Sequence, residues 1–231
     1  MYQHAECRVL DLGRIDYLEA FDLQKRIVDD VISGEAPNTL ITCEHPHVIT
    51  LGRHGKIENI LVSDSELLKQ GVGICYVDRG GDVTYHGPGQ IILYPIFDLK
   101  QDKKDLYLYL RKLEQAVINV LANDLGLNAH READLTGVWV GPYKVASIGI
   151  GVRHWVAYHG LALNVKADKR FFSLIKPCGL DVKMASINDF FDDEVSLEAV
   201  KDMLVESIKD TFGFKIDGGS KNDKSLFAGI R

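Results

Sequence analysis

The sequence lacks several features that would assign it to a specialised class of protein. No apolar run is long enough to cross a bilayer, and the first residues do not form a basic stretch followed by an apolar one, as in a secretory leader. Only four cysteines occur, without a Cys-x-x-Cys pair. Lys and Arg number 27 against 33 Asp and Glu, and the resulting net charge of −6 argues against general nucleic-acid binding. We therefore expect a cytoplasmic protein with reduced cysteines and neither a membrane nor a nucleic-acid partner.

The length and apolar content fit one compact domain. The chain has 231 residues, of which 46% are hydrophobic, and it shows no repeat, linker or break in composition. We expect a single domain over residues 1–231 and a monomer. The polar tail from about residue 218 is expected to be mobile.

Hydrophobic periodicity predicts helices over 16–33, 64–70, 105–125 and 196–212, the first closed by Gly34 and the last by Gly213. Alternating or continuous apolar runs predict strands over 39–43, 48–51, 73–77, 91–96, 138–140, 144–152 and 155–165. Strands and helices do not alternate regularly, and several strands follow one another directly. This order predicts an α+β fold with a mixed, largely antiparallel sheet packed with helices.

The segment from Arg79 to Gln90 is the most informative part of the sequence. Its twelve residues include four glycines, one proline and a histidine, and strand-like runs flank it on both sides. Glycine at this density between two buried strands indicates a backbone that lies close to something else. The alternative is a glycine-rich hairpin that only reverses the chain.

Further segments carry the same signal, and together they resemble one family. They are Glu44-His45-Pro46, Thr50-Leu51-Gly52-Arg53, the run Gly141 to Gly151, and Pro177-Cys178-Gly179. With the Arg-Gly-Gly-x-x-Thr-Tyr-His-Gly-Pro-Gly-Gln run, they resemble the lipoyl(octanoyl) transferases of lipoate biosynthesis. The spacing of 34 positions between Lys144 and Cys178 adds support.

The resemblance implies the fold of the biotin and lipoate protein ligases. It also implies transfer of an octanoyl group from acyl carrier protein to a lysine of lipoyl domains, in 2-oxoacid dehydrogenase complexes and in the glycine cleavage H protein. No metal, ATP or organic cofactor is implied, apart from the phosphopantetheine arm of the carrier protein.

Two residues are the catalytic candidates. Cys178 lies in a loop-like setting, and its thiolate would attack the acyl carbon to form a thioester. Lys144 opens an apolar strand, so it could point into a pocket where desolvation lowers an amine's pKa. It would then take the thiol proton and stabilise the thiolate.

Small residues would line an apolar slot for the acyl chain, and backbone N–H groups of the glycine-rich segments could hold the thioester oxygen. The predicted substrate-binding residues are Arg79, Gly80, Gly81, Asp82, Val83, Thr84, Tyr85, His86, Ser147, Ile148, Gly149, His159, Gly160, Leu161 and Ala162. For His86 and His159, a hydrogen-bonded core histidine is the alternative. His45, His47 and His54 suggest metal ligands only weakly, and we expect no metal site.

Two other functions remain open. An ATP-dependent lipoate or biotin ligase would form an adenylate and need no nucleophilic cysteine, and an inactive scaffold would only bind lipoyl domains. Separately, the segment from Lys166 to Lys183 carries five basic residues against two aspartates, close to Cys178. It is either a docking surface for acidic partner proteins or an ordinary solvated loop.

Overall fold

The computed structural model describes residues 5–176 and 182–216. Cys178 and the tail from 218 lie outside these ranges, so the predictions made for them are not addressed by the structure. In the described ranges, no helix is long and apolar enough to cross a membrane.

An eight-stranded sheet forms the centre of the fold, in the order β11-β1-β2-β6-β10-β9-β8-β7. Strand β1 pairs in parallel with β2 and β11, and all other neighbours are antiparallel. The mixed, largely antiparallel sheet predicted from the sequence is therefore confirmed. The strands are β1 (Glu6–Arg14), β2 (Asn38–Glu44), β6 (Gln90–Ile96), β7 (Ala129–His130), β8 (Val138–Val140), β9 (Tyr143–Arg153), β10 (Val156–Asn164) and β11 (Lys215–Ile216).

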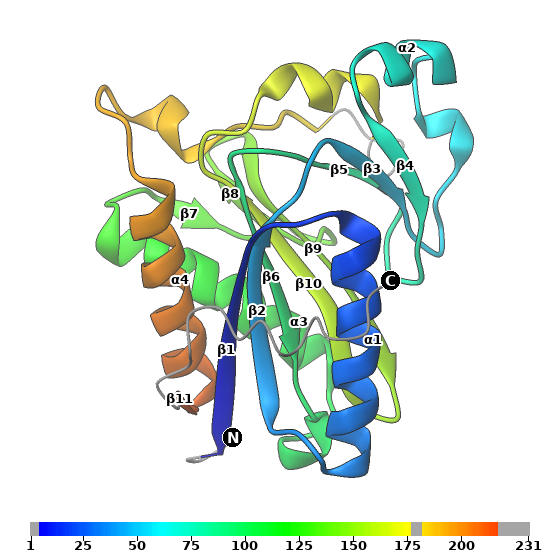
Figure 1. Cartoon of the computed structure of the whole chain (residues 1–231). Coiled ribbons are helices and arrows are strands. Elements are labelled where there is room, and N and C mark those ends of the chain that lie inside the picture. Colours follow the sequence, from blue (N-terminus) through cyan, green and yellow to red (C-terminus); the bar gives the residue numbers. More distant parts are fainter. Residues whose placement is uncertain (1–4, 177–181, 217–231) are drawn as a thin grey trace.

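Helices cover both faces of this sheet (Figure 1). Helix α1 (Tyr17–Ser33) packs on one face, with Asp16 as N-cap and Gly34 as C-cap. On the other face lie α3 (Leu106–Asn119) and α4 (Leu197–Phe212). Helix α4 begins after the N-cap Ser196 and ends at Gly213, as the sequence predicts. The predicted helix over 105–125 ends earlier: a π-helical turn, Val120–Asp124, replaces its last part.

A separate three-stranded sheet lies at one end of the large sheet, in the order β4-β3-β5 (Figure 1). It comprises β3 (Val48–Leu51), β4 (Gly73–Tyr76) and β5 (Val83–His86). The short helix α2 (Asp64–Lys69), capped by Ser63, packs its buried Leu67 into the same core. The 3-10 helix Lys169–Leu174 also contributes to this core.

This small sheet corrects the interpretation of the glycine-rich run. Strand β4 is an edge strand with exposed ends, and it belongs to a different sheet from β6. The run therefore does not join two buried strands, and it is not a hairpin. It passes from the small sheet to the large one and contributes β5, a strand that the sequence pattern did not reveal. Strands β1, β7 and β11 were also not predicted.

Candidate functional site

A cavity of about 370 Å³ lies where the small sheet, the start of α1 and strands β6, β9 and β10 meet. Leu110 of α3, residues 134–136 and residues 182 and 184 complete its wall. The structure brings most of the predicted site residues together around it: Arg79, Gly80, Gly81, Asp82, Val83, Thr84, His86, Lys144, Ser147, Ile148, Gly149, His159, Gly160, Leu161 and Ala162.

Tyr85 does not line the cavity. Its side chain is buried in the core of the small sheet, where its hydroxyl hydrogen bonds to His47 Nδ1 at 2.7 Å. Its ring packs against the rings of Phe171 and Phe172, with 5.3 and 5.1 Å between ring centroids. It supports the small sheet.

Lys144 lies at the start of β9 with its side chain partly buried. Its Nζ donates a hydrogen bond to the carbonyl oxygen of Thr136 at 2.9 Å and lies 4.9 Å from the centre of the Trp139 ring. The amine therefore has one polar and one aromatic contact that hold it in the wall of the cavity.

The described residues on either side of 177–181 form backbone hydrogen bonds. On one side, the backbone N–H of Lys176 donates to the carbonyl oxygen of Asn59 at 2.8 Å. On the other, the N–H of Lys144 donates to the carbonyl oxygen of Lys183 at 2.8 Å, and Ala185 donates back to Lys144 at 3.0 Å.

Small residues of β9 and β10 lie opposite each other: Ser147 pairs with Ala162, and both line the cavity. Gly149 and Gly160 are also opposite each other, and the larger Ile148 and Leu161 form the pair between these two pairs. The small residues leave room beside Ile92 of β6, whose side chain also reaches the cavity. The result is a mostly apolar trough along two adjacent strands.

The glycine N–H groups of the run are largely used inside the protein. Gly80 donates to the carbonyl oxygen of Ile150 at 2.7 Å, Gly87 to Gln90 Oε1 at 3.3 Å, and Gly89 to Glu44 Oε2 at 2.8 Å. These three N–H groups therefore cannot hold a thioester oxygen without giving up an existing hydrogen bond.

Arg79 and Asp82 hold the backbone of the run in place. The Arg79 guanidinium donates to Thr50 O at 2.7 Å, to Thr50 Oγ1, and to the carbonyl oxygen of Gly80 at 3.0 Å. The Asp82 carboxylate accepts from Lys56 N at 3.0 Å and from the Asn59 amide. Both side chains are buried, so their charges are satisfied mainly by fixed backbone and side-chain groups.

His159 forms a polar cluster with Asp78 at the edge of the cavity. Its Nε2 lies 2.8 Å from Asp78 Oδ1, and Tyr158 donates its hydroxyl to Asp78 Oδ2 at 2.5 Å. The hydrogen bond from His159 lowers the pKa of Asp78 to about 2. Burial lowers the pKa of His159 and outweighs the opposing attraction of Asp78. Both pKa shifts agree with a neutral His159 imidazole that donates its Nε2–H to an ionised Asp78 carboxylate.

Other aromatic groups were not predicted from the sequence. Tyr17 stacks on His86 with 5.9 Å between ring centroids, and the Tyr94 hydroxyl lies 2.7 Å from His45 Nε2. Both tyrosines line the cavity and both are buried. His45 also uses its Nδ1, against the Ile15 carbonyl at 2.8 Å, so it is a hydrogen-bonded core histidine rather than a metal ligand.

His86 and His159 each present an unused ring atom. Among the described residues, Nδ1 of neither histidine has a hydrogen-bond partner, although both are buried. Such atoms can interact with a polar group of a bound molecule or with water. The sequence analysis placed both among the predicted substrate-binding residues, with an ordinary core histidine as the alternative.

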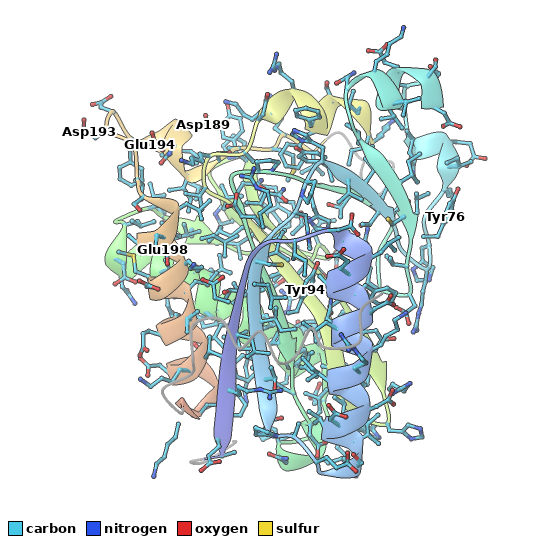
Figure 2. All side chains as sticks on the ribbon, viewed as in Figure 1. Tyr76, Tyr94, Asp189, Asp193, Glu194 and Glu198 are labelled. Carbon is cyan, nitrogen blue, oxygen red and sulfur yellow. The ribbon has the colours of Figure 1, made fainter. Side chains whose placement is uncertain are left out.

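The basic segment 166–183 is partly neutralised. Lys166 pairs with Glu194 at 2.8 Å, Lys169 with Asp189 at 2.8 Å, and Arg170 with Asp168 at 2.6 Å. Figure 2 shows Asp189 and Glu194 in the region that precedes α4. Two of these carboxylates come from outside the segment, so a charge count along the sequence overstates its positive field.

The sequence matches a known protein family over most of its length. Residues 16–209 match the family of the lipoyl protein ligase A/B catalytic domain. An octanoyltransferase of Solibacter usitatus is 48% identical over 181 residues, which is 78% of this chain and 82% of that protein. An octanoyltransferase of Caldicellulosiruptor saccharolyticus is 43% identical over 214 residues, 92% of this chain and 91% of that protein.

Solved structures share the fold at low identity. A lipoate-protein ligase A bound with ATP superimposes with a TM-score of 0.75 at 18% identity, covering 99% of this chain and 94% of that one. A bi-partite lipoate protein ligase from Thermoplasma acidophilum, described with its E2 lipoyl domain, gives 0.74 at 21% identity, covering 98% and 92%. These likenesses concern the fold alone.

Proposed function

The chain belongs to the lipoyl protein ligase A/B catalytic domain family and, within it, to the octanoyltransferases, and from this membership we propose a two-step acyl transfer through Cys178. The enzyme is an acyltransferase. The donor in this proposal is octanoyl acyl carrier protein, and the acceptor is a lysine of an apo-lipoyl domain.

In the first step, Lys144 Nζ takes the proton of the Cys178 thiol. The thiolate attacks the carbonyl carbon of the donor thioester, a new carbon–sulfur bond forms, and the bond to the carrier's sulfur breaks. The proton on Lys144 goes to the departing carrier thiolate. The structural support is the Lys144 amine itself, which the Thr136 carbonyl and the Trp139 ring hold in the wall of an apolar trough.

In the second step, the acceptor lysine attacks the octanoyl–Cys178 thioester as a neutral amine. A carbon–nitrogen bond forms, the Cys178 thiolate leaves, and the proton lost from the acceptor amine restores the thiol by way of Lys144. The product is an amide. Because the thioester already supplies the driving force, the proposal requires neither ATP nor a metal.

Intact-mass spectrometry separates this proposal from its alternatives. We expect the enzyme to gain one octanoyl group from octanoyl carrier protein in the absence of ATP, and to lose it when apo-lipoyl domain is added. If transfer requires free octanoate and ATP, the protein is a ligase. If it binds lipoyl domain without turnover under either condition, it is a scaffold.

A further inference from the structure

Glu114 of α3 is a fully buried carboxylate outside the wall of the cavity. One oxygen, Oε2, accepts from Arg111 Nη1 at 2.7 Å and from Arg131 Nε at 2.9 Å. The other oxygen, Oε1, accepts from the backbone N–H of Gly137 at 3.1 Å. Burying a charge is costly unless it is paired and hydrogen-bonded, and here both oxygens are satisfied.

The contacts of Glu114 fix the connection between β7 and β8. Arg131, at its start, also donates to the Arg111 carbonyl and to Gln115 Oε1, both on α3 at 2.9 Å. Gly137, at its end, is held by Glu114 itself. One carboxylate therefore ties both ends of residues 131–137 to a rigid helix, and residues 134–136 in between line the cavity.

The same contacts reach Lys144 through a single peptide group. The Gly137 N–H that donates to Glu114 and the Thr136 carbonyl that accepts from Lys144 Nζ belong to one amide unit. This unit is planar, so fixing its N–H end also fixes the direction of its carbonyl. A hydrogen bond from the N–H to a carboxylate also polarises the carbonyl and makes it a stronger acceptor.

The space beside this peptide is also shaped for the lysine. Gly137 has φ +141, and a Cβ there would lie 2.5 Å from Lys144 Cε. The lysine side chain can therefore pass across residue 137 only because that residue is glycine.

We infer that Glu114 is a positioning residue: it holds the Thr136–Gly137 peptide so that its carbonyl keeps the Lys144 amine in one position in the cavity wall. This inference rests on the proposed role of Lys144. Glu114 itself touches neither substrate nor thiol in this scheme.

The test measures the single-turnover acylation rate with a small octanoyl thioester, together with the pH dependence of alkylation of Cys178 by iodoacetamide. Rates are compared per folded molecule, with stability followed by urea unfolding. We expect Glu114→Ala to slow acylation by about tenfold to a hundredfold, since small misplacement of a reacting group has effects of this size. Glu114→Gln should fall between Ala and wild type, and both should move the alkylation midpoint to higher pH.

The double variant gives the sharpest outcome. If Glu114 acts through Lys144, then adding Glu114→Ala to Lys144→Met slows acylation no further. If the effects of the two substitutions on the acylation rate multiply, the inference is wrong. It is also wrong if folded Glu114→Ala is acylated at the wild-type rate. If Glu114→Ala does not fold, the same comparison is made with Glu114→Gln.

Asp102→Asn is the matched control, because it removes a carboxylate that pairs with Lys112 of α3 and leaves the contacts of Glu114 with Arg131 and Gly137 in place. We expect it to lose stability and keep the wild-type acylation rate. A wild-type rate in Lys144→Met would overturn both the inference and the proposed role of Lys144. If Lys144→Met is acylated slowly but the Glu114 variants are acylated at the wild-type rate, only the inference about Glu114 is overturned.

Discussion

Gly149 and Gly160 lie directly opposite each other in the β9–β10 pair, and each excludes a side chain for a different reason. A Cβ on Gly149 would lie 2.8 Å from the carbonyl oxygen of Gly80. A Cβ on Gly160 would lie 2.1 Å from the carbonyl oxygen of Leu93. Gly149 therefore lets the loop of residues 79–81 lie close to β9, and Gly160 lets β6 lie close to β10.

Substitution of either glycine by alanine should separate these backbones. We expect Gly160→Ala to lower the free energy of unfolding by about 1–3 kcal/mol, the usual effect of overpacking. Gly149→Ala should additionally weaken substrate binding, because it displaces the loop that borders the cavity. Gly73→Ala is the control, since the nearest atom to its Cβ would be 4.0 Å away. Urea unfolding of all three variants checks this prediction, and equal stability would contradict it.

Replacing Lys144 by methionine keeps the length of the side chain and removes the amine. We expect the fold to remain and acylation to slow by at least about 10²-fold, as is usual when an acid–base group is lost. Alkylation of Cys178 by iodoacetamide should require higher pH, because no cation remains to stabilise the thiolate. An unchanged alkylation profile would remove Lys144 from its proposed role.

Reactivity toward iodoacetamide should distinguish Cys178 from the other cysteines. Burial raises the pKa of Cys7 to about 12 and raises the pKa of Cys43 and Cys75 as well. A thiol with a raised pKa stays protonated and unreactive at neutral pH. Peptide mass mapping after brief alkylation at pH 7 should find the label on Cys178 first. Cys178→Ala should abolish early labelling and the octanoyl adduct, whereas Cys75→Ala should preserve both.

Stability should fall as the solution becomes more acidic than pH 6.5. Burial lowers the pKa of His45, His86 and His159 in the folded protein. Below pH 6.5 the unfolded chain therefore binds protons that the folded chain does not, and the free energy of unfolding decreases with falling pH. Each such histidine contributes up to about 1.4 kcal/mol per pH unit.

Urea unfolding between pH 5 and 8 measures this slope. We expect His86→Phe, which keeps a ring against Tyr17, to make the slope shallower. His54→Gln is the control, because His54 is exposed. Equal slopes in the wild type and in His86→Phe would show that His86 is not held neutral.

Docking of an acidic carrier protein should depend on the basic residues that have no carboxylate partner in residues 5–176 and 182–216. Lys176 and Lys183 are exposed and form no ion pair with any residue in the described ranges, whereas Lys169 and Arg170 do. Reversing both of these charges, in Lys176→Glu with Lys183→Glu, should raise KM for octanoyl carrier protein and flatten its salt dependence. Reaction with a small octanoyl thioester should be nearly unchanged.

Lys169→Glu with Arg170→Glu is the comparison, and its effect on KM should be smaller. If the small thioester and the carrier protein are affected equally by the first pair, the segment has a structural or catalytic role and the docking hypothesis is wrong.

The sequence by itself determined the local features of this protein. Asp16 and Gly34 mark the ends of α1, and Ser196 and Gly213 those of α4, because capping depends on the conformation of a few adjacent residues. The motifs around the glycine-rich run likewise identified the family from residue types and spacing alone.

Tertiary structure decided which of these residues meet. Strand β5 joined the small sheet, and the core of that sheet buried the Tyr85 side chain, whereas Thr84 and His86 line the cavity. The link from Glu114 to Lys144 crosses three separate elements and depends on one peptide group. No periodicity or local motif encodes such a contact, since it exists only once the helix and the strands have packed together.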